Sequence, residues 1–251
     1  SWDQIPYDNV SPSKEVQIER LKTLKILSNS NAKRIILTTI NSITQKIIPR
    51  SIINSQFLKI SKKQKFKLED LINNLVLLGF QRTSLVRDKS EFSVRGSILD
   101  IFPNDRSKPI RIDFFDEEIE TIFEFDPITQ KRLKEINSDL EFNIINELIL
   151  NENNLNLFRK NFREIFPEYR NSQVYNLFSE NIIPSGGEQF LPLFYDNLET
   201  LFDYVKDYKI LLNDEFKNIF ENRLENINDF YLARKNNNCL LYTSPSPRDR
   251  N

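Results

Sequence analysis

The sequence has no histidine, no methionine and a single cysteine among its 251 residues. One cysteine, Cys239, excludes an internal disulfide bond and a cysteine metal cluster. The lack of histidine excludes histidine bases and histidine-ligated metal sites. Much of the usual chemistry of enzyme active sites is therefore absent from this sequence.

Glycine is also scarce, with four residues in the whole chain: Gly79, Gly96, Gly186 and Gly187. A Walker A loop needs the pattern GxxxxGK[ST], in which backbone amides surround the phosphates and the lysine reaches them. None of the four glycines precedes a lysine. The sequence therefore contains no Walker A loop, and we expect no bound cofactor in this part of the protein.

The chain also lacks long apolar runs and a strong charge. No stretch of about 18 apolar residues is present, which argues against a membrane-spanning helix, and no signal peptide pattern is found. The formal net charge is -1, from 35 basic and 36 acidic residues, so a general electrostatic attraction to nucleic acid or to a membrane surface is not indicated. We expect a soluble cytoplasmic protein without a membrane partner.

The two ends suggest a piece of a longer protein. The chain starts at Ser1, within sequence that already looks structured, and no methionine occurs anywhere. Near the other end, "CLLYTSPSPRD" differs in composition from the preceding Asn-, Lys- and Ile-rich sequence and resembles a translated sequencing adapter. We therefore expect residues 236–251 to be a non-native tail.

The first 50 residues have the pattern of helix, buried strand and helix. Ser11-Pro12 is a helix start signal, and apolar residues then recur at helical spacing as far as Leu27. "RIILTT" (residues 34–39) is wholly apolar between its ends, which predicts a strand covered on both faces. "INSITQKII" after it predicts a helix that ends at Pro49.

Further elements are predicted downstream. Leu68 to Leu78 is an apolar helix that ends at Gly79, a residue suited to a left-handed C-cap, and Phe80 to Val86 is strand-like. A helix is predicted where Leu155, Phe158, Phe162 and Phe166 recur at spacings of three and four. "YKILLNDEF" (residues 208–216) predicts another buried strand.

The stretch from Glu91 to Asp126 reads as three strands of an antiparallel unit with one buried face. Ile110, Ile112 and Phe114 alternate with Arg111, Asp113 and Phe115, so the second set lies on the opposite face. Ile119, Thr121, Phe123 and Phe125 repeat the alternation. An arginine and a phenylalanine on a polar face are typical of protein interfaces. Alternatively, Arg111 pairs with Asp113, and a nearby loop covers Phe115.

Two acidic groups are candidates for metal-binding sites. Asp214-Glu215 follows a predicted strand, where a Walker B pair would hold magnesium and orient water, and the alternative is an exposed acidic turn. Asp116, Glu117 and Glu118 offer carboxylates for a nuclease metal site, but they fall where a hairpin connects two strands, and such carboxylates are usually solvated.

Several segments resemble the amino-terminal, UvrB-like region of the bacterial transcription-repair coupling factors (Mfd). They are listed in chain order: "WDQIPYDNVSP" (residues 2–12), "EFSVRGSILDIFP" (residues 91–103), "IRIDFFDEEIETIFEFDPITQKR" (residues 110–132) and "LPLFYDNLETLFDYV" (residues 191–205). Some of these segments also fit UvrB. "IPYDNVSPSKEV", however, passes quickly into a helix where UvrB would carry a long aromatic hairpin, which favours the coupling factors.

The resemblance implies an α/β fold in which a partial, degenerate RecA-like domain carries an inserted α+β interaction domain of the UvrB type. The implied domains are residues 1–51 and 138–235 for the two parts of the RecA-like domain, and residues 52–137 for the insert, which would bind UvrA. Family motifs place UvrA contacts on Arg95, Arg111 and Phe115. Asp214 and Glu215 would be a degenerate Walker B pair.

For the whole protein, the resemblance implies an ATP-dependent translocase on double-stranded DNA that displaces stalled RNA polymerase and recruits nucleotide excision repair. ATP and magnesium would belong to that longer protein, and this chain itself would be non-catalytic. A fragment of a UvrB-type excinuclease helicase subunit is the alternative.

Overall fold

The computed structural model describes residues 1–2, 4–29, 33–206 and 208–236, which form two compact units. Unit 1 combines Ser1–Ile52 with the chain from Glu147 onward, and unit 2 is Ile53–Asn146. Apart from residue 236, the expected non-native tail, with Cys239, lies outside the described residues.

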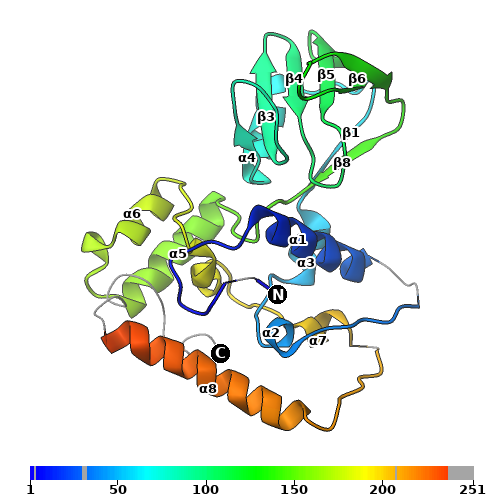
Figure 1. Ribbon diagram of the computed structural model, residues 1–251. Coiled ribbons are helices and arrows are strands. Elements are labelled where there is room, and N and C mark those ends of the chain that lie inside the picture. The colour runs from blue at the N-terminus through cyan, green and yellow to red at the C-terminus, as the bar shows by residue number, and fades with distance from the viewer. Residues whose placement is uncertain (3, 30–32, 207, 237–251) are drawn as a thin grey trace. The chain divides into compact units, whose positions relative to one another are not determined.

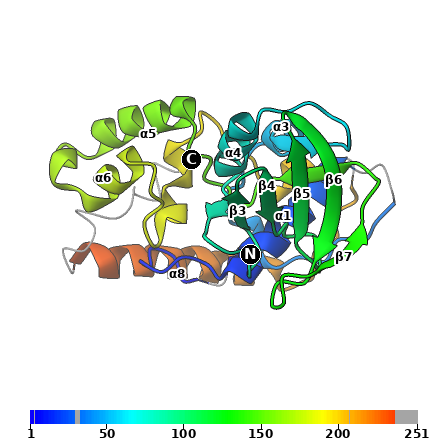
Figure 2. The ribbon, with the colours of Figure 1, turned by 90° about the horizontal axis from the view of Figure 1, so that it is seen from above.

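Unit 2 contains a six-stranded sheet in the order β2-β3-β4-β5-β6-β7. Its strands are β2 (Gln81–Arg82), β3 (Glu91–Arg95), β4 (Ile98–Ile101), β5 (Ile110–Phe115), β6 (Glu118–Phe125) and β7 (Arg132–Glu135). The pair β2 and β3 is parallel, whereas β3 to β7 form an antiparallel meander, as the alternation predicted. Figure 2 shows β3 to β7 side by side in this order.

Two tight turns shape the meander. The stretch from Glu91 to Asp126 forms four strands rather than three, because Gly96 and Ser97 turn the chain between β3 and β4. Gly96 has φ 60°, a left-handed conformation that glycine adopts without steric cost. Asp116, at φ 56°, and Glu117 form the turn between β5 and β6.

The predicted alternation along β6 is wrong in its second half. Asp113 pairs with Thr121 while the next residue, Phe114, pairs with Ile119, so Glu120 is an extra residue in β6. Such a bulge shifts the phase of all side chains beyond it. Ile119 and Ile122 are therefore the buried pair, while Thr121 and Phe123 are only half-buried.

The core of unit 2 lies on one face of this sheet, the core face. It consists of Phe92, Leu99, Ile101, Ile110, Ile112, Phe114, Ile119 and Ile122, all buried. Helix α4 (Leu68–Leu77) buries Leu71 and Leu75, and Gly79 after it has φ 97°, so the predicted helix and its C-cap are confirmed. The predicted strand from Phe80 to Val86 shrinks to the two residues of β2.

A separate pair of strands joins the two ends of unit 2. β1 (Phe57–Ile60) pairs antiparallel with β8 (Leu140–Asn143), and both lie in the unit (Figure 1). The insert was predicted to end at residue 137. The compact unit continues to Asn146 because β8 supplies the only strand partner that β1 has among the described residues.

Unit 1 is built from helices. They are α1 (Lys14–Asn29), α2 (Ile40–Ile43), α3 (Arg50–Ser55, which extends into unit 2), α5 (Glu152–Ile165), α6 (Gln173–Ser179), α7 (Leu201–Tyr204), α8 (Phe216–Asn236) and the 3₁₀ helices η1 (Tyr169–Asn171) and η2 (Gly187–Leu193). The predicted apolar stripes are buried at Leu21, Leu24 and Leu27 of α1 and at Leu155, Phe158 and Phe162 of α5, whereas Phe166, directly after α5, is half-buried. Phe158 and Phe162 form an aromatic cluster with Phe178 and Phe194. No helix in the described part of the chain is long and apolar enough to cross a membrane.

Two predicted strands of unit 1 are wrong. Residues 34–39 form no strand, and Ile35 and Leu37 are 92% and 93% exposed. Residues 208–216 form no strand either, and Leu211 is 85% exposed. An apolar run becomes a strand only where another strand pairs with its backbone, and the described part of unit 1 has only the isolated bridge between Ile47 and Glu199. The helix predicted before Pro49 is a single turn, α2.

Candidate protein–protein interface

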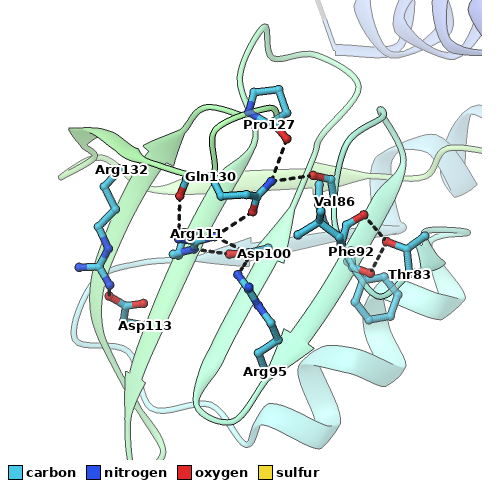
Figure 3. Close-up of polar contacts among 11 residues, drawn as sticks. Thr83, Val86, Phe92, Arg95, Asp100, Arg111, Asp113, Pro127, Gln130 and Arg132 are labelled. Carbon is cyan, nitrogen blue, oxygen red and sulfur yellow. Dashed lines mark hydrogen bonds and ion pairs between the residues drawn. The ribbon is translucent and has the colours of Figure 1, made fainter.

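The face of the six-stranded sheet opposite the core carries the predicted contact residues. Ser93, Asp100, Arg111 and Phe123 lie directly opposite one another on β3, β4, β5 and β6. Paired residues of adjacent strands point to the same side of a sheet, and the period of two adds Arg95, Asp113 and Phe115. We call this side, which carries Arg95, Asp100, Arg111, Asp113 and Phe115, the arginine face. Figure 3 shows the first four of these residues.

Arg111 is fixed within its own domain. Its Nε and Nη2 atoms donate to the two carboxylate oxygens of Asp100 at 2.7 and 2.9 Å. Gln130 lies over it and accepts two longer hydrogen bonds of 3.3 Å, and the guanidinium carbon lies 4.6 Å from the ring centre of Phe125. Only 8% of the residue is exposed. The hydrogen bonds that Arg111 donates to Asp100 raise the pKa of the Arg111 guanidinium, which remains charged.

A small apolar cluster supports this arginine. Phe125 packs with Val86 and Phe102, and all three are buried although they are not part of the core face. A guanidinium over an aromatic ring gains a cation–π attraction that grows when the pair is shielded from water. The ring and the carboxylate therefore hold the Arg111 side chain in one orientation.

Arg95 shares the same carboxylate but is more exposed. Its Nη2 atom donates to Asp100 Oδ2 at 2.8 Å, while about half of the side chain faces solvent. Its Nε and Nη1 atoms make no hydrogen bond within the described residues. Two guanidinium groups thus share one buried carboxylate, which leaves one positive charge uncompensated at this point of the arginine face.

The expected alternative pairing of Arg111 with Asp113 does not occur. Asp113 accepts instead from Arg132 Nη2 at 2.6 Å and from the hydroxyl of Thr121 at 3.0 Å. Arg132 also lies with its guanidinium carbon 4.8 Å from the ring centre of Phe123. The register explains this, because Asp100 is directly opposite Arg111 whereas Asp113 is opposite Thr121.

Phe115 ends β5, and no loop covers it. The residue is 74% exposed, whereas its neighbour Phe114 is buried on the core face. Of the three predicted contact residues, Phe115 and Arg95 are accessible and Arg111 is not. The structure thus places all three on one face but assigns them different environments.

Sequence reasoning missed Asp100 and Gln130. Asp100 lies between Leu99 and Ile101 in a buried strand, and an acidic residue in such a strand is a signal that a cation pairs with it. Gln130 has φ 59° in the turn before β7, and its contact with Arg111 depends on how that turn folds back over the sheet. No local pattern encodes that contact.

The acidic groups lie in turns. Asp116 and Glu117 are exposed in the hairpin turn, as predicted, and Glu118 begins β6. Asp214 and Glu215 lie in an exposed turn before α8, and no strand precedes them. Within the described residues, no group of three or more Asp, Glu, Cys or His side chains is arranged to hold a metal ion.

Comparison with known proteins finds similar sequences for the part of the chain that forms this sheet. Residues 58–141 match the model of the UvrB interaction domain. The whole chain is similar to proteins named transcription-repair-coupling factor. The relative from Rickettsia typhi is 35% identical over 98% of this chain and 22% of its own length.

Two further relatives have the same name. That from Haemophilus influenzae is 34% identical over 85% of this chain and 19% of its own length, and that from Escherichia coli is 30% identical over 84% and 18%. The chain spans about a fifth of the length of these relatives. The resemblance drawn from the sequence motifs is confirmed.

Proposed function

We propose that unit 2 docks UvrA during transcription-coupled nucleotide excision repair, because residues 58–141 match the model of the UvrB interaction domain in a chain similar to the transcription-repair-coupling factors. The exposed ring of Phe115, on the same sheet face as Arg95 and Arg111, is the observation that supports this proposal most directly. Aromatic residues and arginine dominate the energetically important positions of protein interfaces.

Each predicted contact residue has a distinct role in the proposal. Phe115 is the apolar anchor, because covering roughly 150 Å² of its ring at about 25 cal/mol per Å² provides up to about 4 kcal/mol. Arg95 offers its uncompensated charge to a carboxylate of UvrA. Arg111 is buried and has mainly a positioning role. It donates to Asp100, the carboxylate to which Arg95 also donates, and so fixes the orientation of Arg95.

The test is the affinity of the complete chain for purified UvrA, measured by calorimetry or interferometry. We expect Phe115→Ala to weaken binding by about 1 to 4 kcal/mol, as truncation of an anchor does. Arg95→Ala should weaken it as well. Because both side chains are accessible, neither change should lower the thermal stability of the chain by more than a few degrees.

The matched control is Val76→Ala, an exposed apolar side chain on α4, which should leave binding unchanged. The proposal fails if the wild-type chain does not bind UvrA. It also fails if Phe115→Ala binds as tightly as the wild type. Arg111→Ala is less informative, because it leaves the buried carboxylate of Asp100 without its main partner.

The proposal for the longer protein rests on the same similarity to the transcription-repair-coupling factors. In our proposal the longer protein is a cytoplasmic, ATP-dependent translocase on double-stranded DNA that displaces stalled RNA polymerase. We propose that ATP and Mg²⁺ act in parts of the longer protein outside this chain. Unit 1 corresponds in this proposal to the degenerate RecA-like domain, with Asp214 and Glu215 as the remnant of a Walker B pair. The sequence on both sides of this chain tests it, because a Walker A motif upstream would support a UvrB-type helicase subunit instead.

A further inference from the structure

The segment between β6 and β7 folds onto the arginine face. We call residues Asp126–Arg132, the last of which is the first residue of β7, the β6–β7 segment. Its Gln130 accepts hydrogen bonds from Arg111 through the backbone oxygen and through Oε1, both at 3.3 Å. The Nε2 atom of Gln130 donates to the carbonyl oxygens of Pro127 at 2.8 Å and Val86 at 3.4 Å (Figure 3). This one side chain thus joins the turn to β5 and to the loop before β3.

The turn itself is ordered by Asp126. One carboxylate oxygen accepts from the backbone amides of Ile128 and Thr129 at 3.0 and 2.8 Å and from the Thr129 hydroxyl at 3.0 Å. These bonds, those from Thr129 above all, hold the pKa of Asp126 below its usual value. The backbone amide of Asp126 also donates to the carbonyl oxygen of Lys131, and the carbonyl oxygen of Asp126 accepts from the amide of Gln130. A turn fixed in this way loses little conformational entropy when a partner covers it.

The tip of this ordered turn is apolar. Ile128 is 89% exposed, the largest exposed fraction of any large apolar residue in unit 2. Polar residues with turn propensity would normally occupy such a position. An ordered turn with an exposed isoleucine is suited to bind an apolar depression on a partner protein.

Arg132 closes the segment on the same face. Its ion pair with Asp113 and its stacking on Phe123 hold the guanidinium over the sheet, while about half of the side chain stays exposed. The backbone of Arg132 pairs with Phe125, beyond the level of Arg111, but its guanidinium reaches Asp113, which is midway between Arg111 and Phe115 along β5.

A protein interface covers a larger area than Arg95, Arg111 and Phe115 provide, so the docking surface must extend beyond these residues. Along β5 the distance from Arg111 to Phe115 is only about 14 Å at 3.4 Å per residue. A standard interface buries about 800 Å² on each partner, which is a much wider patch. A partner that covers Phe115 and Arg95 therefore also reaches neighbouring elements, and the β6–β7 segment continues the same surface.

We infer that the β6–β7 segment is part of the docking surface for the partner proposed above, with Ile128 as a second apolar anchor and Arg132 as a contact for an acidic side chain. This inference rests on the proposed function. The partner surface that fits it has one apolar depression for each of Phe115 and Ile128, with carboxylates between them facing Arg95 and Arg132.

The experiment compares variants of the complete chain for binding to purified UvrA. We expect Ile128→Ser to weaken binding at least fivefold and Arg132→Glu to weaken it at least tenfold, with most of the second effect in the association rate at low salt. Arg132→Lys should keep part of the affinity because it retains the charge. Val76→Ala is the control for a lost apolar side chain outside the arginine face.

Hydrogen exchange provides a readout that a structural role would not change. Binding of UvrA should slow exchange of the Ile128 and Thr129 amides in the wild-type chain. The thermal unfolding of each variant shows whether the fold is intact.

The outcomes separate the two proposals. If Phe115→Ala weakens binding but the Ile128 and Arg132 variants bind like the wild type, the β6–β7 segment is not part of the surface and only this inference is overturned. Unchanged exchange at Ile128 and Thr129 in the complex overturns it as well. If the wild-type chain does not bind UvrA, the proposed function fails and this inference fails with it.

Discussion

Asp100 and Arg111 lie directly opposite each other on β4 and β5, and two hydrogen bonds of 2.7 and 2.9 Å join the carboxylate to the guanidinium. Both residues are buried, and the half-exposed Arg95 also donates a hydrogen bond to the Asp100 carboxylate. The pair therefore belongs to the folded structure of unit 2 and also determines how the arginine face presents its charge.

Replacing Asp100 should destabilise the chain strongly. Asp100→Asn leaves a buried guanidinium without its counter-charge, so we expect the free energy of unfolding to fall by about 3 kcal/mol. Asp113→Asn is the control, because the Arg132 side chain that pairs with Asp113 is half-exposed, and such a pair should be worth about 1 kcal/mol or less. Urea unfolding of the complete chain, with hydrogen exchange at the β4 and β5 amides, measures both. Equal losses for the two variants would contradict the assignment.

The glycines at positive φ should differ in their tolerance of alanine. Gly96 has φ 60° and no neighbour within 4 Å of an added Cβ, so Gly96→Ala should cost only the backbone strain of about 1 to 2 kcal/mol. At Gly186, with φ 71°, an added Cβ would lie 2.8 Å from the backbone oxygen of Asp8, so Gly186→Ala should cost clearly more. Thermal unfolding of the two variants tests the order, and Gly96→Asn should be milder than Gly96→Ala because asparagine tolerates this conformation.

Glu188 should give unit 1 a pH-dependent stability. Burial raises the pKa of this carboxyl above its usual value of 4.5. The folded state therefore binds the proton more tightly than the unfolded state, and this contribution to stability is lost as pH rises from about 4.5 through the folded-state pKa. Measured against Glu188→Gln, in which the group cannot ionise, the wild-type chain should become relatively less stable over that range. A constant difference between the two unfolding curves from pH 4.5 to 7 would show that the pKa is not raised.

Ile35 tests the corrected assignment of residues 34–39. A buried strand there predicts that Ile35→Ser lowers the free energy of unfolding by several kcal/mol, as polar substitution in a core does. The structure leaves this side chain in solvent, so the loss should stay below about 0.5 kcal/mol. Ile48→Ser, at a fully buried position of the same unit, is the control and should be severely destabilised. Similar losses in the free energy of unfolding for Ile35→Ser and Ile48→Ser would show that residues 34–39 are a buried strand after all.

Prediction from sequence succeeded where one element carries its own signal. The apolar spacing in α1, α4 and α5 identified these helices, because a helix needs only one apolar stripe and its own backbone hydrogen bonds. It failed for residues 34–39 and 208–216, because a strand also needs a neighbour that no local pattern supplies. The bulge at Glu120 was missed for the same reason, since it is defined by the register between β5 and β6.

That Arg111 and Phe115 share one side of a single strand follows from the sequence alone, because alternate residues of an extended chain always do. The exposure of the ring and the burial of the guanidinium depend on how the rest of unit 2 folds around that strand. Asp100 reaches Arg111 through the pairing of β4 with β5, and Gln130 reaches it through the fold of the turn before β7. Such contacts join residues 11 and 19 positions apart, and they depend on strand register and turn geometry rather than on any periodicity along the chain.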